Sequence, residues 1–470
     1  MQETKNIVIH ERSERRTRVR WAIVSLLFIA ILFNYADREI WIVSEPAFAY
    51  SFGWSYSPTH LDALAIHNIS LILFFWSLSY AIFNFPGGWI VDKLGLRKSM
   101  TTMFAIWSIF TALTAATFNF ITMAIVRIVM GAGEGPVWPI NSKVVKGWAS
   151  RFDESKSFTL AGAGQAVGPV IGLIAGGILV TLFGWPSAFI FFGVLGLIFV
   201  AIWFFYVRDR PSEDSKVNEN ELAYIIEGKT NEEKEEKILP SKVNWKISAR
   251  MIFGTQAGLG TLLVFLSFGY VLFTFLYWLP PLMFSTFAHT VEKSGLYSAA
   301  IDVALIAGFL GSGPFNDGLL KRFPDNKPLA RRLGAIIPMV LMIVMVGLSY
   351  FTGKAHNLVG TAIFLGVGSG LMNLTVGSWA VNAVDLAPAG TSATVYGIYN
   401  GSLNFIGAFN AIIEGILFIR YGPVLAFTSS ILFMLMFLGG YLGLIRKNTW
   451  ERAMKYKEEL SREAYSYLKG

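Results

Sequence analysis

Residues 21–44 read WAIVSLLFIAILF-NYADRE-IWIVS, an apolar run interrupted by a polar cluster that contains Asn34, Asp37 and Arg38. The run is about 24 residues long, which is enough for a helix to cross the hydrocarbon core of a bilayer. Asp37 and Arg38 therefore fall inside a membrane-spanning helix, where an ionised side chain costs roughly 2.5–3.5 kcal/mol on insertion scales. The cluster indicates either a substrate or proton site, or an ion pair that fixes the register of the helices.

The composition of the 470-residue chain is typical of an integral membrane protein. Hydrophobic residues make up 54% of the chain and its mean hydropathy is +0.52, which is rare in soluble domains. Cysteine is absent, so the chain has neither a disulfide nor a thiolate metal site. The first 20 residues are polar and basic, and the first apolar run has full span length, so we expect no cleavable signal peptide.

The spacing of the apolar runs predicts an all-α integral membrane protein with twelve transmembrane helices. We expect these helices at 21–44, 68–91, 99–118, 121–142, 157–182, 186–207, 255–285, 296–319, 332–352, 356–383, 393–419 and 423–445.

The distribution of lysine and arginine predicts the orientation. With the N-terminus inside, the inner segments hold 34 of the 39 Lys and Arg residues and the outer loops hold only Lys293, Lys354 and Arg420. This asymmetry follows the positive-inside rule and places both termini in the cytoplasm, with the chain in the cell membrane. It also explains the sequence pI of about 9.4 without a nucleic-acid partner.

The polar segment 208–250 divides the chain into two halves of six spans. We expect a cytoplasmic tail at 1–20, an N-terminal half at 21–207, a cytoplasmic linker at 208–250, a C-terminal half at 251–446 and a cytoplasmic tail at 447–470. The tripeptide Gly228-Lys229-Thr230 resembles the end of a phosphate-binding loop, but Ala223 stands where that loop needs glycine, so we expect no nucleotide cofactor.

A similar loop sequence occurs once in each half of the chain. Residues 88–98 read GWIVDKLGLRK and residues 313–322 read GPFNDGLLKR, and their aspartates, Asp92 and Asp317, are 225 positions apart. A six-plus-six duplication is a transporter architecture in which the binding site lies at the midplane between the halves.

These motifs resemble those of a known family. The loop at 88–98 resembles the signature loop of the major facilitator superfamily, G-x-x-x-D-x-x-G-x-R-K/R. Within it, residues 34–38 and 127–139 (RIVMGAGEGPVWP) are similar to the first- and fourth-helix motifs of the anion:cation symporter family, and residues 275–280 (FLYWLP) resemble the end of its seventh helix. The resemblance implies a carrier of sugar acids or other carboxylates coupled to protons.

Some positions depart from the family pattern. Gly269 and Phe273 replace a usual asparagine and tyrosine, and Ala411 replaces a usual proline. Glu414 stands where a neutral residue is usual. Because it is close in sequence to Arg420, we expect Glu414 to form a partly hydrated ion pair near the outer mouth.

The fourth span carries a second set of charges. Arg127 and Glu134 are seven residues apart and share a helix face, with Gly131 between them. Burial favours a protonated carboxyl and a nearby arginine favours the ionised form, so Glu134 can exchange a proton. We therefore expect Asp37 and Glu134 to couple protons, although a permanent Glu–Arg strut is the alternative.

The planar fork of arginine fits a carboxylate substrate, so Arg38 and Arg127 are candidate anion ligands. By resemblance to the family, Arg38 also exchanges partners with Asp37. We expect the other lining residues to be Tyr35, Tyr80, Gln165, Trp379, Asn400 and Asn404, each of which can instead be core packing. We expect Asp92, Arg97, Lys98 and Asp317 to gate the cytoplasmic side through charge pairs and nearby helix ends.

The sequence thus favours a monomeric secondary active transporter that carries an organic anion with protons. Alternatives are an organic anion exchanger, because GQAVGPVIG at 164–172 resembles an exchanger motif, and a non-transporting sensor on the same fold. Close packing of helices is the other interpretation of those glycines. None of the five histidines falls mid-span, and no nucleophile–base set is evident, so we expect neither a metal site nor an enzyme.

Overall fold

The computed structural model describes residues 15–55, 63–227, 241–287 and 291–466. Within those ranges the chain is helical and has no strand. Ten of the described helical segments are long and apolar enough to cross a membrane. The tripeptide Gly228-Lys229-Thr230 and the histidines His10, His60 and His289 lie outside the described residues.

The helices before the polar linker form one group, which we call the N-terminal group. Its members are α1 (Val19–Ser51), α2 (Ala63–Thr114), α3 (Phe120–Glu134), α4 (Val137–Trp148), α5 (Glu154–Gly162), α6 (Gly164–Phe183) and α7 (Trp185–Tyr206). The segments expected at 68–91 and 99–118 correspond to the two arms of α2, which meet at a sharp kink at Gly95, where the backbone is not helical. The φ of Gly95 is +82°, a conformation that favours glycine, and Asp209 packs against it.

The helices after the linker form the C-terminal group. Its members are α11 (Gln256–Phe287), α12 (Val291–Arg322), α13 (Lys327–Lys354), α14 (Leu358–Leu374), α15 (Val376–Leu386), α16 (Ser392–Tyr421), α17 (Pro423–Ser429) and α18 (Ile431–Gly439), which continues into a π-helical turn, Gly440–Leu444. The linker holds a 3₁₀ turn (Pro211–Glu213), α8 (Glu219–Ile226) and α10 (Ser241–Phe253), and α19 (Lys447–Ser466) follows the last apolar helix.

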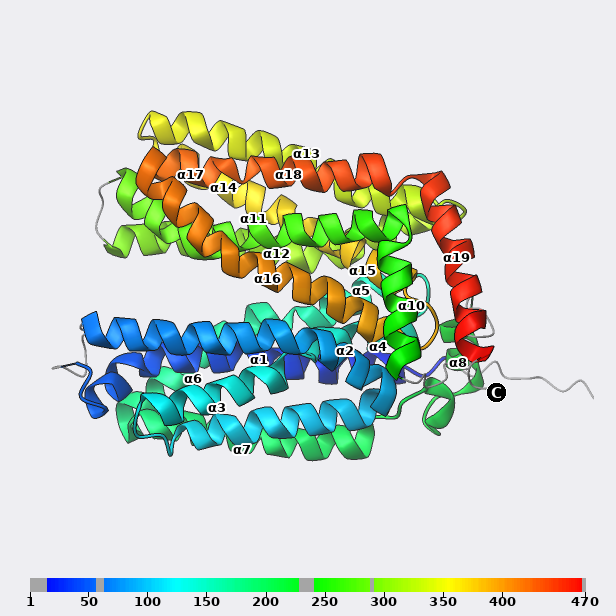
Figure 1. Ribbon diagram of the computed structural model, residues 1–470, viewed down its shortest axis with the longest axis horizontal. Coiled ribbons are helices and arrows are strands. Elements are labelled where there is room, and N and C mark those ends of the chain that lie inside the picture. The colour runs from blue at the N-terminus through cyan, green and yellow to red at the C-terminus, as the bar shows by residue number, and fades with distance from the viewer. Residues whose placement is uncertain (1–14, 56–62, 228–240, 288–290, 467–470) are drawn as a thin grey trace, which may run out of the picture.

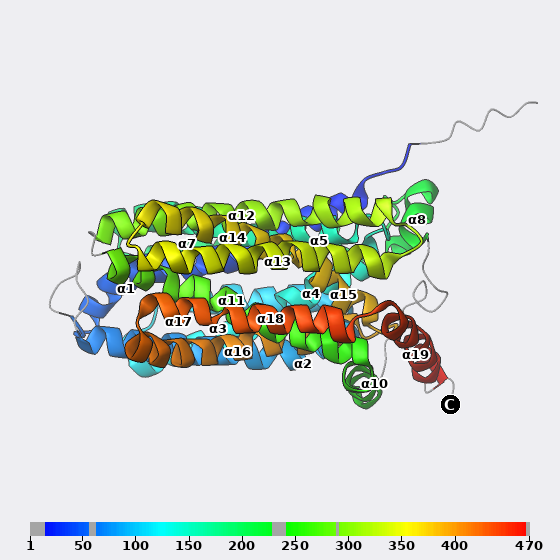
Figure 2. The same ribbon diagram turned by 90° about the horizontal axis from the view of Figure 1, so that it is seen from above.

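The two groups lie as two layers, with α1, α2, α3, α6 and α7 in one and α11–α14 and α16–α18 in the other (Figure 1). Helices α8, α10 and α19 gather at one end of the bundle, which we call the linker end. Figure 2 shows α10 and α19 beside each other at that end. Helix α16 begins beside α2 and α4 at the linker end and diverges from α2 toward the other end (Figure 1).

Two carboxylates bridge the layers at the linker end. Asp92 on α2 accepts hydrogen bonds from two backbone N–H groups in the first turn of α16, at 2.7 and 3.1 Å. Asp317 on α12 does the same with the first turn of α5, at 2.7 and 3.2 Å. Helix N-termini attract negative charge, so the aspartates of the repeated loop hold the layers together in the same way.

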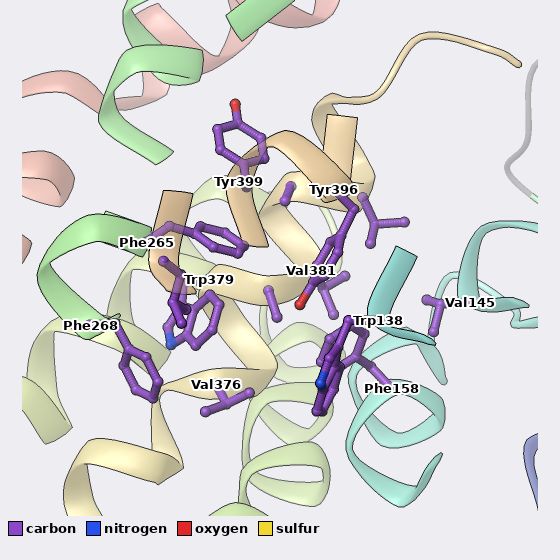
Figure 3. Packing of buried hydrophobic residues seen from close by; sticks show 14 of the residues in the cluster. Trp138, Val145, Phe158, Phe265, Phe268, Val376, Trp379, Val381, Tyr396 and Tyr399 are labelled. Atoms are coloured by element: carbon purple, nitrogen blue, oxygen red, sulfur yellow. The ribbon is translucent and has the colours of Figure 1, made fainter. Parts of the chain in front are cut away.

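An ionic network and an aromatic cluster reinforce this contact. Glu154 on α5 accepts from Lys327 at 2.9 Å and from Arg331 at 3.1 Å, both on α13. Phe158 on α5 packs against Tyr396 on α16, with ring centroids 5.6 Å apart. Figure 3 shows this pair inside a larger set of buried aromatic rings drawn from both groups. The layers are therefore closed against each other at the linker end.

Candidate functional site: an acid–base cluster in the N-terminal group

Asp37 lies on α1 and is 4% exposed. Its Oδ2 accepts hydrogen bonds from the indole nitrogen of Trp107 and, at 3.2 Å, from the hydroxyl of Thr111, both on the second arm of α2. Its Oδ1 is buried and accepts no hydrogen bond. The neighbouring helix thus fixes one oxygen of this carboxyl and leaves the other available.

Arg127 on α3 is buried, with 3% of its surface exposed. Its guanidinium carbon lies 3.9 Å from the ring centroid of Trp41, one turn beyond Asp37 on α1. The carboxyls of Asp37, Glu45 and Glu134 are all near enough to interact with it electrostatically. Stacking on indole stabilises a desolvated guanidinium and holds it in the middle of these acids.

Glu134 is fully buried at the end of α3. Its Oε2 accepts from the indole nitrogen of Trp76 on α2 at 3.2 Å, while its Oε1 has no hydrogen-bond donor. Gly131 allows this contact, because a Cβ there would lie 2.6 Å from the backbone oxygen of Trp76. The glycine between Arg127 and Glu134 therefore lets α3 approach α2 closely, and the acid meets an indole as a result.

Arg38 is half-buried and surrounded by aromatic rings. Its guanidinium carbon lies 4.4 Å from the ring centroid of Tyr35, 4.9 Å from that of Trp76 and 5.4 Å from that of Tyr80. It also donates a long hydrogen bond of 3.5 Å to Asn34. These contacts hold the guanidinium beside Glu134, which interacts with it electrostatically.

The structure thus brings together the four charged residues predicted from the first and fourth spans. One oxygen of each carboxyl accepts a hydrogen bond from an indole N–H, and the other oxygen accepts none. Arg127 keeps two buried N–H groups, at Nε and Nη2, without an acceptor. Unsatisfied donors and acceptors at one site can bind an anion and exchange a proton.

Three other predicted lining residues have hydrogen-bond partners outside the four charged residues. Asn400 on α16 donates to Asn84 on α2 at 2.7 Å, which ties the two layers together, and Asn404 donates to the backbone of Asn400. Trp379 is buried against Phe265 and Phe268, as Figure 3 shows, and its indole donates to Thr375. Gln165 is half-buried on α6.

The glycines of the segment 164–172 pack α6 against α1. A Cβ on Gly164, Gly168 or Gly172 would lie 2.4–2.5 Å from a backbone oxygen of α1, and for Gly172 that oxygen belongs to Ala36, next to Asp37. Close packing beside the charged cluster therefore accounts for this motif.

The gating candidates do not act as one set. Asp92 and Asp317 bridge the two layers, as described above. Arg97 instead lies within the N-terminal group, where its backbone N–H donates to Asp209 and its guanidinium donates to the backbone oxygen of Phe204. Lys98 is exposed next to it.

The expectation of a hydrated Glu414–Arg420 pair is wrong. Glu414 is 1% exposed, and its Oε1 accepts from Ser429 at 3.3 Å and, more weakly, from Thr274 at 3.5 Å. Arg420 is exposed. Six residues advance a helix by about 600°, so the two side chains leave α16 in directions roughly 120° apart.

The sequence analysis missed the residues that contact the charges, Trp41, Trp76, Trp107 and Thr111, the neighbouring acid Glu45, and Asn84, which joins the layers. Five of them lie inside the expected apolar spans, where tryptophan and threonine are ordinary. One signal was available, because Trp41 follows Asp37 by four residues and so shares its helix face. In the described part of the chain, no three His, Asp or Glu side chains gather as a metal site would require.

Comparison with known proteins identifies the family. A family model, described as the Major Facilitator Superfamily, matches residues 27–412. The "Probable galactarate/D-glucarate transporter GudP" of Escherichia coli is 27% identical over 416 residues, covering 86% of this chain and 88% of that protein. The "Hexuronate transporter" of Bacillus subtilis is 27% identical over 355 residues, covering 73% and 76% of the two chains.

Solved structures share the fold. The Escherichia coli fucose:proton symporter FucP superposes with a TM-score of 0.63 at 14% identity, covering 90% of this chain and 99% of that one. The human organic anion transporter MFSD10 superposes with a TM-score of 0.59, also at 14% identity, covering 92% and 100%. The family match spans most of the chain, so this integral membrane protein belongs to the major facilitator superfamily.

Proposed function

We propose that the chain is a secondary active transporter that moves a sugar acid, or a related carboxylate, together with protons across the cell membrane. The observation that carries the proposal is the buried cluster of Asp37, Arg38, Arg127 and Glu134, in which each carboxyl keeps one oxygen unsatisfied. The relatives named for galactarate, glucarate and hexuronate support a sugar acid as the substrate. On this proposal the protein acts as a monomeric carrier without a cofactor, rather than as an enzyme.

Proton coupling follows from the balance of charge in the cluster. Asp37 and Glu134 balance the two arginines, and the half-buried Glu45 adds a further acid beside Arg127. A substrate carboxylate therefore adds negative charge that the site does not compensate. Such a charge is costly unless a proton enters with it. Asp37 and Glu134 are the proton carriers in this scheme, because their free oxygens can accept one.

Arg38 and Arg127 both bind the substrate anion, but they differ in burial and in their neighbours. Arg38 is half-buried among three aromatic rings, so it offers the substrate a guanidinium with apolar walls for a sugar backbone. Arg127 is deeper and keeps two unsatisfied N–H groups. Tyr35 and Tyr80 line the same place, and Gln165, Trp379, Asn400 and Asn404 serve the substrate only after the layers rearrange.

Alternating access uses the two groups as rocking halves. In this scheme the chain crosses the membrane twelve times, and the crossings are α1, the two arms of α2, α3 with α4, α5 with α6, α7, α11, α12, α13, α14 with α15, α16, and α17 with α18. In this scheme the linker end and both termini face the cytoplasm, and closure of the layers at that end corresponds to the state closed to the inside. Asp92 and Asp317 stabilise that state, Arg97 supports the kink of α2 next to Asp92, and Lys98 adds a positive charge beside it.

Uptake by purified protein in proteoliposomes tests the proposal. Sugar acids, dicarboxylates and aromatic acids are first ranked by thermal shift, and the best is then supplied as a labelled substrate with an inward pH gradient, an inward sodium gradient or neither. Accumulation driven by pH alone supports symport. Counterflow without accumulation would make the protein an exchanger, binding without either would make it a sensor, and a sodium requirement would reassign the coupling ion.

A further inference from the structure

A basic hollow, separate from the charged cluster, lies at the linker end. Its volume is about 1460 Å³, and it is open to solvent. Three segments far apart in the sequence form its walls: the chain before α1, the start of α5, and α8 of the linker. The cations among its lining residues are Arg15, Arg16, Arg18, Arg20 and Lys156, and its acids are Asp153 and Glu227.

The linker helix builds one wall by binding the start of α1. Glu221 on α8 is fully buried and accepts from the Thr17 hydroxyl at 2.6 Å, from the Val19 N–H at 3.0 Å and from the Arg20 guanidinium at 2.8 Å. Burial alone would raise the pKa of Glu221, but these hydrogen bonds outweigh it and hold that pKa below its ordinary value of 4.5. Glu221 is therefore ionised, and its hydrogen bonds hold together α8 and the start of α1, which form two walls of the hollow.

The acids of the hollow are partly engaged, whereas most of its cations are not. Asp153 accepts from the Tyr224 hydroxyl at 2.9 Å and lies 3.8 Å from Arg20. Within the described residues, no acidic side chain forms an ion pair with Arg15, Arg16, Arg18 or Lys156. Arg16 stacks on Tyr224 at 4.3 Å and Lys156 on Trp21 at 5.0 Å, so two of these cations are held by rings.

We propose that this hollow binds the anionic phosphate headgroup of a membrane phospholipid or, by the same chemistry, a free phosphate ester. Four cations from two segments line an open hollow large enough for such a group, and Arg and Lys are the usual ligands of phosphate. Trp21 lies in the wall at the start of the first membrane helix, which is the depth at which tryptophan meets lipid headgroups. The position favours the lipid as the natural source.

The test measures binding by the purified full chain in detergent, by native mass spectrometry and by thermal shift. The probes are dioleoyl phosphatidylglycerol, dioleoyl phosphatidylcholine and glycerol 3-phosphate. The test variant is Arg15→Gln/Arg16→Gln/Arg18→Gln. The matched control is Arg452→Gln/Lys455→Gln/Arg462→Gln, which removes three exposed cations from α19. Lys156→Gln is a second test from another wall.

We expect phosphatidylglycerol to bind more tightly than phosphatidylcholine. Each cation near an anionic headgroup is worth about a fivefold change in affinity, so the triple variant should weaken binding on the order of 100-fold and Lys156→Gln about fivefold. The control should change it less than twofold. Competition by glycerol 3-phosphate at equal concentration would support a soluble ester as the occupant, and its failure would support the lipid. Equal affinity for both lipids, or an equal loss in the control variant, would overturn the proposal.

Discussion

Asp92→Asn tests whether the contact between the repeated loop and α16 holds the transporter closed at the linker end. In the wild type, Oδ1 accepts from Ala393 N–H and from the Lys143 ammonium at 3.3 Å, and Oδ2 accepts from the N–H and hydroxyl of Thr394 at 2.7 and 2.6 Å. All four partners are donors. Asparagine offers one oxygen and one NH₂, so its NH₂ must face donors whichever way the amide turns.

The magnitude follows from the hydrogen bonds that are lost. A hydrogen bond to a charged group contributes about 1.5–3 kcal/mol, and the substitution removes at least two that join the layers or position the carboxylate. Because the cost falls on the closed state, the equilibrium should shift toward opening at the linker end by about 3 kcal/mol, a factor on the order of 100. Binding of substrate at the charged cluster should change little.

The assay is a distance measurement between the layers. The chain lacks cysteine, so Leu94→Cys and Arg322→Cys introduce two spin labels without background, one in each layer at the linker end. Pulsed electron resonance should show a longer distance in the Asp92→Asn background, and proteoliposome uptake should fall. Asp325→Asn, an exposed acid at the same end, is the control. An unchanged distance distribution, or an equal change in the control, would refute the reasoning.

Four further substitutions test other parts of the structure. Glu134→Gln mimics the protonated acid, so it should keep substrate binding and counterflow but lose pH-driven accumulation; full accumulation would make this carboxyl structural. Arg127→Lys loses the planar fork that stacks on indole and should raise the substrate Kd by about 10- to 150-fold, corresponding to about 1.5–3 kcal/mol in equilibrium dialysis. Gly131→Ala places a methyl 2.6 Å from a backbone oxygen and should cost about 1–3 kcal/mol by thermal shift, whereas Gly177→Ala meets no atom within 4 Å and should be neutral. Glu221→Gln should expose the chain before α1 to protease at all pH values. In the wild type the pKa of Glu221 is lowered, so the carboxylate stabilises this contact fully above pH 4.5. The protection of the wild type should disappear only as the pH falls through that lowered pKa.

The helices could be predicted because bilayer-length apolar runs need no tertiary information. The geometry of the turns between them was harder to predict. The polar loop at 92–98 was expected to separate two spans, and the backbone does leave helical geometry there, at Gly95, where the two arms of α2 meet at a kink. The turn depends on a φ of +82° and on packing against Asp209, which lies more than 100 residues away. A local sequence pattern does not contain that contact.

Helix periodicity explains which part of the site could be predicted from the sequence. Arg127 and Glu134 share a face because they are seven residues apart, and this relation survives any packing of α3. The partners of the acids come from α2, and they depend on where two helices cross. Gly131 marks that crossing, since it admits the backbone of Trp76, but a glycine in a sequence does not say which neighbour will approach.

The paired indoles give the site a property that the charges alone would lack. An ion pair between each acid and each arginine would satisfy the groups and leave little reason to bind a substrate or a proton. Here Trp76 and Trp107 each donate a hydrogen bond to only one oxygen of a carboxyl. The ring face of Trp41 stacks on Arg127 and leaves the N–H donors of the guanidinium unused. A neutral donor stabilises a carboxylate less than a cation does, so both protonation states stay accessible. On the proposed function, partial satisfaction by indoles therefore keeps these acids and bases available for a substrate anion and its proton.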